Sequence, residues 1–174
     1  MTATARPRHT LNDLVTVLDR LSGLHDDLCA ALVRKLDCIR RADYSAMHAC
    51  DHTLRTLTGR IGEQNGLRKQ LAEQLGKPFG LAPERARDLT LNEFAGRLAD
   101  PDRTRVMASA DRLRAVVRDV EALNRLIDRV AAEVLNHVHQ AVAAITTQPD
   151  DGVQYTRDGR PRAAARRELF EALG

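Results

Sequence analysis

His48 and His52, with Asp51 beside them, are the residues that could most directly bind a metal ion. Histidines four residues apart lie on one face of a helix, where both could coordinate the same divalent cation. Two ligands do not complete a metal site, and we expect no other cluster of histidines or cysteines near them. We therefore interpret both histidines as solvated side chains near the start of a helix, and we predict no metal and no cofactor.

The chain carries none of the short motifs that are typical of enzymes, such as G-x-S-x-G, the P-loop, G-x-G-x-x-G or H-E-x-x-H. Its three cysteines, Cys29, Cys38 and Cys50, contain no C-x-x-C pair and predict free thiols in a reducing cytoplasm. Catalysis needs convergent polar groups in a concave site, and the sequence predicts none. We therefore expect a protein that is not an enzyme and has no small-molecule substrate.

The end of the chain holds two of its five aromatic residues, Tyr155 and Phe170. Aromatic side chains supply a large contact area at a small entropy cost, so they are good anchors on a partner protein. Proline, glycine and arginine interrupt any apolar pattern around them. We predict that residues 149–174 form a mobile C-terminal tail, which is disordered or folds as a short amphipathic helix. The alternative is that the aromatic rings fold back on the chain's own helices.

One stripe of apolar residues has steps that alternate between four and three over about 40 residues. This period of 3.5 is typical of a long helix that packs on its neighbours by left-handed supercoiling. We predict that this helix starts with Asp100 as N-cap and Pro101 in its first turn, and ends near residue 147. The stripe comprises Val106, Ala110, Leu113, Val117, Val120, Asn124, Ile127, Ala131, Val134, Val138, Ala141 and Ile145.

Asn124 is the single polar residue of this stripe. A buried asparagine in such a seam fixes register and partner choice at some cost in stability, and a direct binding role is the alternative. The first interpretation predicts that Asn124→Leu raises the melting temperature. A second row, which includes Leu123, widens the apolar face. We therefore expect the long helix to pack between the two helices that precede it.

Apolar periodicity predicts three further helices, over residues 11–41, 44–76 and 90–99. Thr10 and Asp43 are the expected N-caps of the first two, and Thr90-Leu91-Asn92-Glu93 is a capping box for the third. A short turn is favoured at residues 40–45, with a kinked continuous helix as the alternative. The second helix carries Gly59, Gly62 and Gly66, which we interpret as allowing another helix to come close.

Composition agrees with helix packing, because only 3% of the 174 residues are aromatic and 43% are hydrophobic. There is no apolar run of 18 residues that would insert in a membrane, and the N-terminus lacks the apolar segment of a secretory signal. The predicted fold is an all-α, antiparallel, coiled-coil-like bundle of three long helices plus one short helix. We predict a bundle domain over residues 1–148 and a flexible tail over residues 149–174.

Two short segments, set within this order of helices, resemble the FlgN family of flagellar type III export chaperones. They are Leu123-Asn124-Arg125-Leu126-Ile127 in the long helix and Tyr155-Thr156-Arg157-Asp158-Gly159 in the tail. The resemblance covers about residues 11–160. The chain departs from the family pattern at Arg125, where a second asparagine is common, and at Ala42, where a glycine is usual. The arginine-rich end after Gly159 is a further departure.

The resemblance implies a cytoplasmic chaperone that binds hook–filament junction proteins, prevents their premature assembly and delivers them to the membrane export gate. A client's amphipathic terminal helix would lie in an apolar groove. The long last helix and the tail resemble the client-binding part, and Tyr155 takes the place of the aromatic residue that contacts the export gate. The implied partner-binding residues are Asn124, Leu126, Ile127, Val134, Val138, Tyr155, Gly159 and Phe170.

Two binding functions compete with this interpretation. A self-associating structural coiled coil would form larger assemblies, which light scattering would detect. A nucleic-acid-binding module that uses Arg157 to Arg167 would lose affinity steeply as salt rises. The net charge of +3 is too small to favour nucleic acid by itself. A metal-dependent enzyme on His48 and His52 would require at least one equivalent of bound metal.

Overall fold

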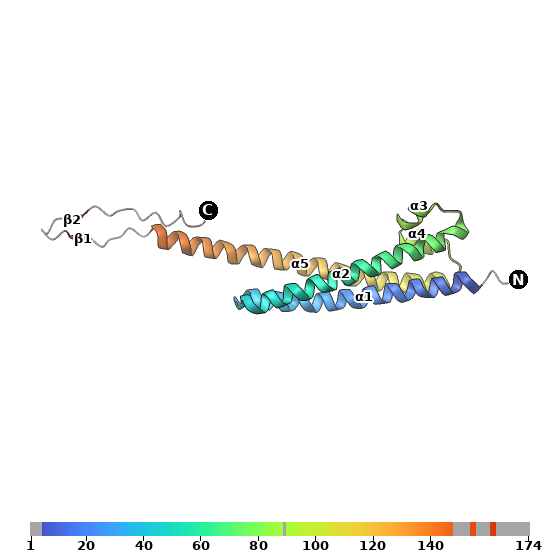
Figure 1. Cartoon of the computed structure of the whole chain (residues 1–174), viewed down its shortest axis with the longest axis horizontal. Coiled ribbons are helices and arrows are strands. Elements are labelled where there is room, and N and C mark those ends of the chain that lie inside the picture. The colour runs from blue at the N-terminus through green and yellow to red at the C-terminus, as the bar shows by residue number, and fades with distance from the viewer. Residues whose placement is uncertain (1–4, 89, 148–153, 156–160, 163–174) are drawn as a thin grey trace. The chain divides into compact units, whose positions relative to one another are not determined.

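The computed structural model describes residues 5–88, 90–147, 154–155 and 161–162. Three long helices make up most of this part, and in Figure 1 the second runs opposite to the first and third. The all-α bundle predicted from the sequence is confirmed. The long helices are α1 (Ala5–Arg40), α2 (Tyr44–Gly76) and α5 (Asp102–Thr147), and the short elements are η1 (Lys77–Phe79), α3 (Pro83–Asp88) and α4 (Leu91–Ala95).

The chain divides into two compact units, residues 1–132 and residues 133–174. The first unit holds α1 to α4 and most of α5. The second holds the end of α5 and two short strands, β1 (Gln154–Tyr155) and β2 (Pro161–Arg162), which pair antiparallel. The sequence had not predicted these strands. The rest of the predicted tail lies outside the described residues.

The turn between α1 and α2 is short, as the sequence favoured, and the continuous kinked helix is wrong. Ala42 takes the left-handed conformation (φ 54°), and the amide of Asp43 donates to the carbonyl of Cys38 across it. A left-handed residue closed by such a hydrogen bond is a common way for a helix to end. Glycine would adopt this conformation at position 42 without strain. Asp43 then caps α2, because its carboxylate accepts a hydrogen bond from the amide of Ala46 at 2.9 Å.

The predicted helix ends at residues 76 and 147 are confirmed, whereas several other ends differ from their predictions. Thr10 is not an N-cap, because α1 already begins at Ala5, where Pro7 fits a first turn that needs no amide donor. The capping box of Thr90 and Glu93 is confirmed, but α4 ends at Ala95. α5 begins at Asp102, one residue later than predicted.

α3 was not predicted, although the sequence signals its start. Pro83 occupies the first helical position and Glu84 lies in the first turn, where a negative charge is favourable. The preceding segment closes tightly on α3, since a Cβ added at Gly76 would lie 2.7 Å from the Cβ of Ala86. Phe79 of η1 packs edge-to-face on Phe94 of α4, with ring centroids 6.4 Å apart.

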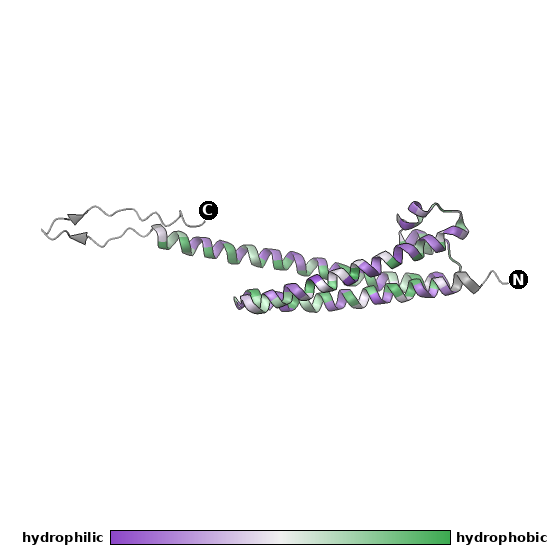
Figure 2. Ribbon diagram, in the orientation of Figure 1, coloured by the Kyte–Doolittle hydropathy of each residue, from purple (hydrophilic) through white to green (hydrophobic). Residues whose placement is uncertain are grey.

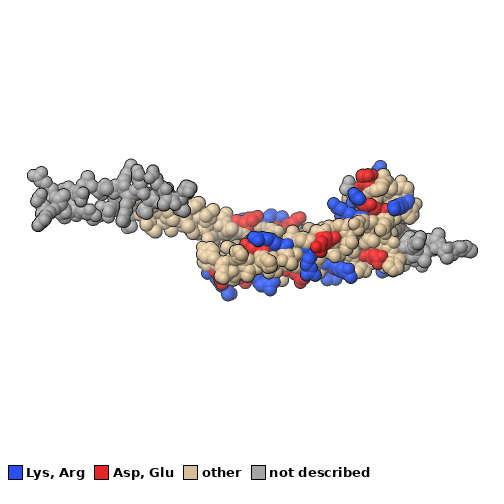
Figure 3. Space-filling view, viewed as in Figure 1, with Lys and Arg blue, Asp and Glu red and all other residues tan. Residues whose placement is uncertain are grey.

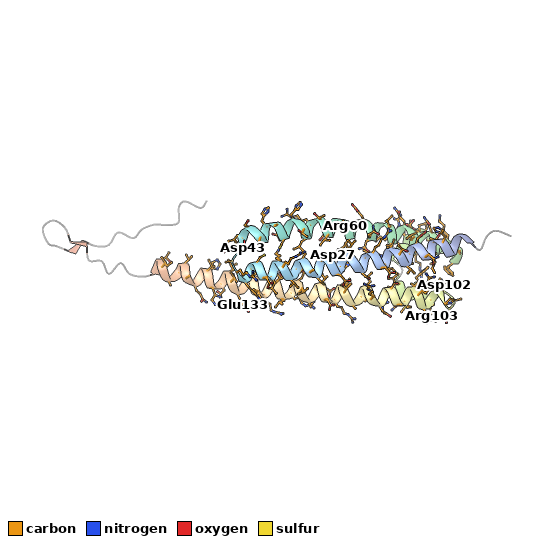
Figure 4. The ribbon with its side chains drawn as sticks, turned by 90° about the horizontal axis from the view of Figure 1, so that it is seen from below. Asp27, Asp43, Arg60, Asp102, Arg103 and Glu133 are labelled. Carbon is orange, nitrogen blue, oxygen red and sulfur yellow. The ribbon has the colours of Figure 1, made fainter. Side chains whose placement is uncertain are left out.

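The hydrophobic core forms three clusters, and α1 contributes to every one of them. At one end Leu11, Leu14 and Leu18 of α1 pack with residues of α2, α4 and α5. Further along, Leu24 and Ala31 pack with α2, and then Leu32 and Leu36 pack with α5. Figure 4 accordingly shows α1 between α2 and α5. The prediction that the last long helix lies between the other two is wrong, because α1 has the broader buried face.

Within the first unit, α5 buries most of the predicted stripe, together with the row beside it. Val106, Ala110, Val120 and Ile127 are buried as expected, but Asn124 is exposed. The neighbouring row also contributes to the core, with Val116 buried and Leu123 and Val130 packed against it. Burying these apolar side chains stabilises the fold more than burying Asn124 would, and the side-chain amide of Asn124 stays hydrated.

The glycines of α2 do not bring another helix close, so that interpretation is wrong. A Cβ added at Gly59, Gly62 or Gly66 would meet no atom within 4 Å.

Figure 2 shows that hydrophobic residues recur along the visible part of α5. Among the described helices, none is both long enough and apolar enough to cross a membrane.

Candidate partner-binding surface

The end of α5, within the second unit, exposes a series of large apolar side chains. Val134 is 39% exposed, and Ile145 is 75% exposed. Most of the residues in this series are three or four positions apart, so the series lies on one face of the helix, which we call the apolar face of α5. This face consists of Val134, Leu135, Val138, Val142 and Ile145.

Exposed apolar residues elsewhere in the described chain are scattered, whereas these five are contiguous. Val33, Tyr44, Leu67 and Phe79 are the other large ones, and no two of them are helical neighbours. Single exposed apolar residues are normal on a protein surface, but a contiguous series marks an interaction site. The apolar face of α5 is therefore the strongest candidate for a binding surface.

The same stretch of helix carries no charge. After Glu133 the sequence contains no Lys, Arg, Asp or Glu up to Thr147, although 29% of the whole chain is charged. Figure 3 shows this as a length of α5, next to the undescribed tail, with neither blue nor red atoms on the visible side. Alanines at positions 141, 143 and 144 keep the segment helical, because alanine has the highest helix propensity. Such a surface suits another apolar helix rather than a charged ligand.

The structure separates the predicted site residues on α5. Ile127 is buried in a core cluster with Val120, and Leu126 is half-buried against it. Asn124 is exposed in the first unit, and Val134 and Val138 are exposed in the second. Of the named residues, therefore, Ile127 has the least surface left for a partner.

The predicted site residues of the tail are largely beyond the described part of the chain. Tyr155 is located by the backbone of β1, and Gly159 and Phe170 lie outside the described residues. The sequence prediction missed Leu135 and Val142, which lie in neither of the two predicted rows. Their spacing relative to Val138 and Ile145 was a usable signal.

The polar residues considered for chemistry do not assemble into a reactive site. No three His, Cys, Asp or Glu side chains of the described chain are placed to hold a metal ion. Asp51 instead accepts a hydrogen bond from Lys35 Nζ at 2.7 Å, and this bond lowers the pKa of the Asp51 carboxyl. Cys29, Cys38 and Cys50 are free thiols, and burial raises the pKa of Cys29 and of Cys38.

No curated protein and no solved structure matches the chain. The model of the FlgN protein family matches residues 1–163, which is most of its length. The helical bundle and its exposed apolar face agree with the partner-binding role that such a family would need. The chain therefore belongs to the FlgN family, whose members are flagellar export chaperones that bind flagellar proteins.

Proposed function

We propose that this chain binds the amphipathic terminal helix of hook–filament junction proteins in the cytoplasm and delivers them to the export gate. It acts by binding and carries out no reaction. The observation that supports this proposal most is the apolar face of α5, five large apolar side chains on a charge-free stretch of helix. A client helix laid on this face would remove apolar surface from water on both partners, at about 25 cal/mol per Å².

The contact can be tested by introducing charge into the apolar face. We expect V138E/V142E to weaken binding of a junction protein's terminal segment at least tenfold, measured by calorimetry, because the glutamates would be desolvated under the client. N136E/Q140E is the matched control, since it adds the same charge on the opposite side of the same helical turns. It should change the affinity less than twofold. Equal affinity for all three proteins would reject the apolar face as the site.

The tail is the second proposed contact. Tyr155 and Phe170 are its aromatic anchors, and Tyr155 is the residue proposed to meet the export gate. A chain that lacks residues 149–174 should bind the client less well than the whole chain. Undiminished binding would place the client site on α5 alone. Residues 1–148 as a bundle and 149–174 as a tail remain a proposal for the domain organisation.

Self-association is the competing use of the same surface, because two copies could pair their apolar faces. Light scattering at several concentrations distinguishes the two functions. A chaperone should remain a monomer or dimer and should bind a client helix. A structural coiled coil should grow into larger assemblies, and V138E/V142E should dissolve them.

A further inference from the structure

A cavity of about 590 Å³ in the first unit has a lining whose described charged side chains are all basic. It lies where α2, α3, α4 and α5 come together, far along the chain from the apolar face of α5. Arg68 and Lys69 line it from α2, Arg87 from α3 and Arg114 from α5. Thr90, Leu91 and Asn92 at the start of α4 complete the lining, in which no described side chain is a carboxylate.

The contrast with two other cavities of the first unit shows that this charge is unusual for the protein. A cavity of about 450 Å³ sets Asp51 beside Lys35 and Arg55. A cavity of about 330 Å³ balances Arg20 and Arg60 with Asp27 and Glu63. Figure 4 shows Asp27 on α1 and Arg60 on the neighbouring α2. Arginine is abundant in this chain, but in those two cavities it is accompanied by carboxylates.

The carboxylates near the basic cavity neutralise only part of its charge. Arg87 pairs with Glu73, and Arg114 pairs with Asp111 and also donates to the side-chain oxygen of Asn92. Among the described residues, the one side-chain acceptor of Arg68 is the amide oxygen of Asn65, at 3.4 Å. In the described part of the chain, no ion pair involves Arg68 or Lys69. Two positive charges at the cavity are therefore available to a ligand.

We propose that this cavity binds a short acidic peptide segment of a partner protein. Guanidinium groups hold carboxylates through paired hydrogen bonds, and Arg68 with Lys69 supplies the charge that no carboxylate of the described chain balances. Leu91 adds an apolar side chain to the lining, and this side chain could contact the part of the peptide between its acidic residues. The contact uses a different unit of the chain from the proposed client surface, so it does not depend on that proposal.

A nucleic acid fits this cavity less well. A phosphate backbone carries evenly spaced charges and is bound by a continuous basic track. Glu73 and Asp111 interrupt the basic surface on two sides, because they pair with Arg87 and Arg114. They would repel a backbone that runs on beyond the cavity. A few carboxylates on a short peptide need only the interior of the cavity.

The test uses the full chain and a fluorescein-labelled hexaglutamate peptide, with binding followed by fluorescence anisotropy at low ionic strength. We expect R68E/K69E to weaken binding at least tenfold. R55E/R60E is the matched control, because it makes the same charge change on exposed residues of the same helix outside this cavity. It should change the affinity less than twofold. K69E alone, at an exposed position, should weaken binding severalfold and guards against misfolding of the double variant.

Three results would overturn the proposal. They are no measurable binding of the peptide, an equal loss in R68E/K69E and R55E/R60E, and competition by a single-stranded 12-mer oligonucleotide at lower concentration than by unlabelled hexaglutamate. The second would show general attraction to a basic surface. The third would assign the cavity to nucleic acid.

Discussion

Two residues of α5, one helical turn apart, have opposite surroundings, although both belong to the predicted apolar stripe and to the predicted partner-binding residues. Ile127 is 7% exposed and lies in a core cluster, whereas Asn124 is exposed. We expect Ile127→Ala to lower the free energy of unfolding by about 3 kcal/mol, because it leaves a cavity in the core. Asn124→Ala should change it by no more than about 0.5 kcal/mol. Urea unfolding followed by circular dichroism measures both, and comparable losses would put Asn124 back in the seam.

The ion pair of Lys35 and Asp51 makes stability depend on acid pH. The ordinary pKa of an Asp carboxyl is 3.8, and the hydrogen bond from Lys35 lowers the pKa of Asp51 below this value in the folded chain. The stabilisation is therefore fully present above pH 3.8. It is lost as the pH falls below 3.8 and through the folded pKa. Both side chains are partly exposed, so the pair contributes about 0.5 kcal/mol.

Replacing Asp51 by asparagine tests this contribution. Wild type and Asp51→Asn should differ in urea midpoint at neutral pH, and the difference should shrink on acidification below 3.8. The acid-unfolding profiles of Asp37→Asn and wild type serve for comparison, since the ion pair of the Asp37 carboxylate with Arg40 is long, at 3.9 Å, and lies on the surface. A difference that persists unchanged in acid would mean that Asp51 acts through something other than its charge.

At the scale of the helix, the open glycines of α2 are places where the chain is less stable than it could be. Alanine at Gly59, Gly62 and Gly66 would meet no atom within 4 Å and would restrict the unfolded backbone. We expect the triple variant to be more stable by about 2 kcal/mol. Gly76→Ala should do the reverse, since its Cβ would lie 2.7 Å from that of Ala86. Thermal melts decide, and a triple variant that melts lower would show that the glycine face is in contact after all.

Helix ends were predictable wherever a side chain of the chain itself makes the cap. Asp43 accepts from the amide of Ala46, and Thr90 with Glu93 closes a capping box, so short-range sequence was enough in both cases. Glu93 has a lowered pKa because Thr90 donates hydrogen bonds to its carboxylate. The prediction of Thr10 as an N-cap was wrong, because α1 starts at Ala5 and threonine, although a common N-cap residue, can also occur inside a helix. Local signals do not tell which of two consecutive starts is used.

The exposure of Asn124, within a stripe that is otherwise mostly buried, was not predictable from periodicity. The row with Asn124 and the row with Leu123 run side by side at the same spacing, so either could be covered at this level of the helix. The apolar area that the neighbouring helices offer there decides which row is covered. The absence of charge after Glu133, in contrast, is visible in the sequence and marks the candidate surface directly.

At the scale of the whole molecule, stability and partner binding are expected to reside in different units. Every residue of the three core clusters, together with the apolar residues packed on them, falls between Leu11 and Val130. The apolar face of α5 begins at Val134 and belongs to the second unit. The core therefore contains no residue of the proposed client surface.

A chain ending at Ala132 should consequently keep the unfolding midpoint of the whole protein, because no described core contact is removed. It should unfold cooperatively in urea and lose affinity for the client's terminal segment, since the apolar face is gone. Calorimetry with the same client segment measures the second effect on the same samples. A shortened chain that melts broadly would mean that residues 133–174 help to hold the bundle together. The proposed division between a stabilising unit and a binding unit would then be wrong.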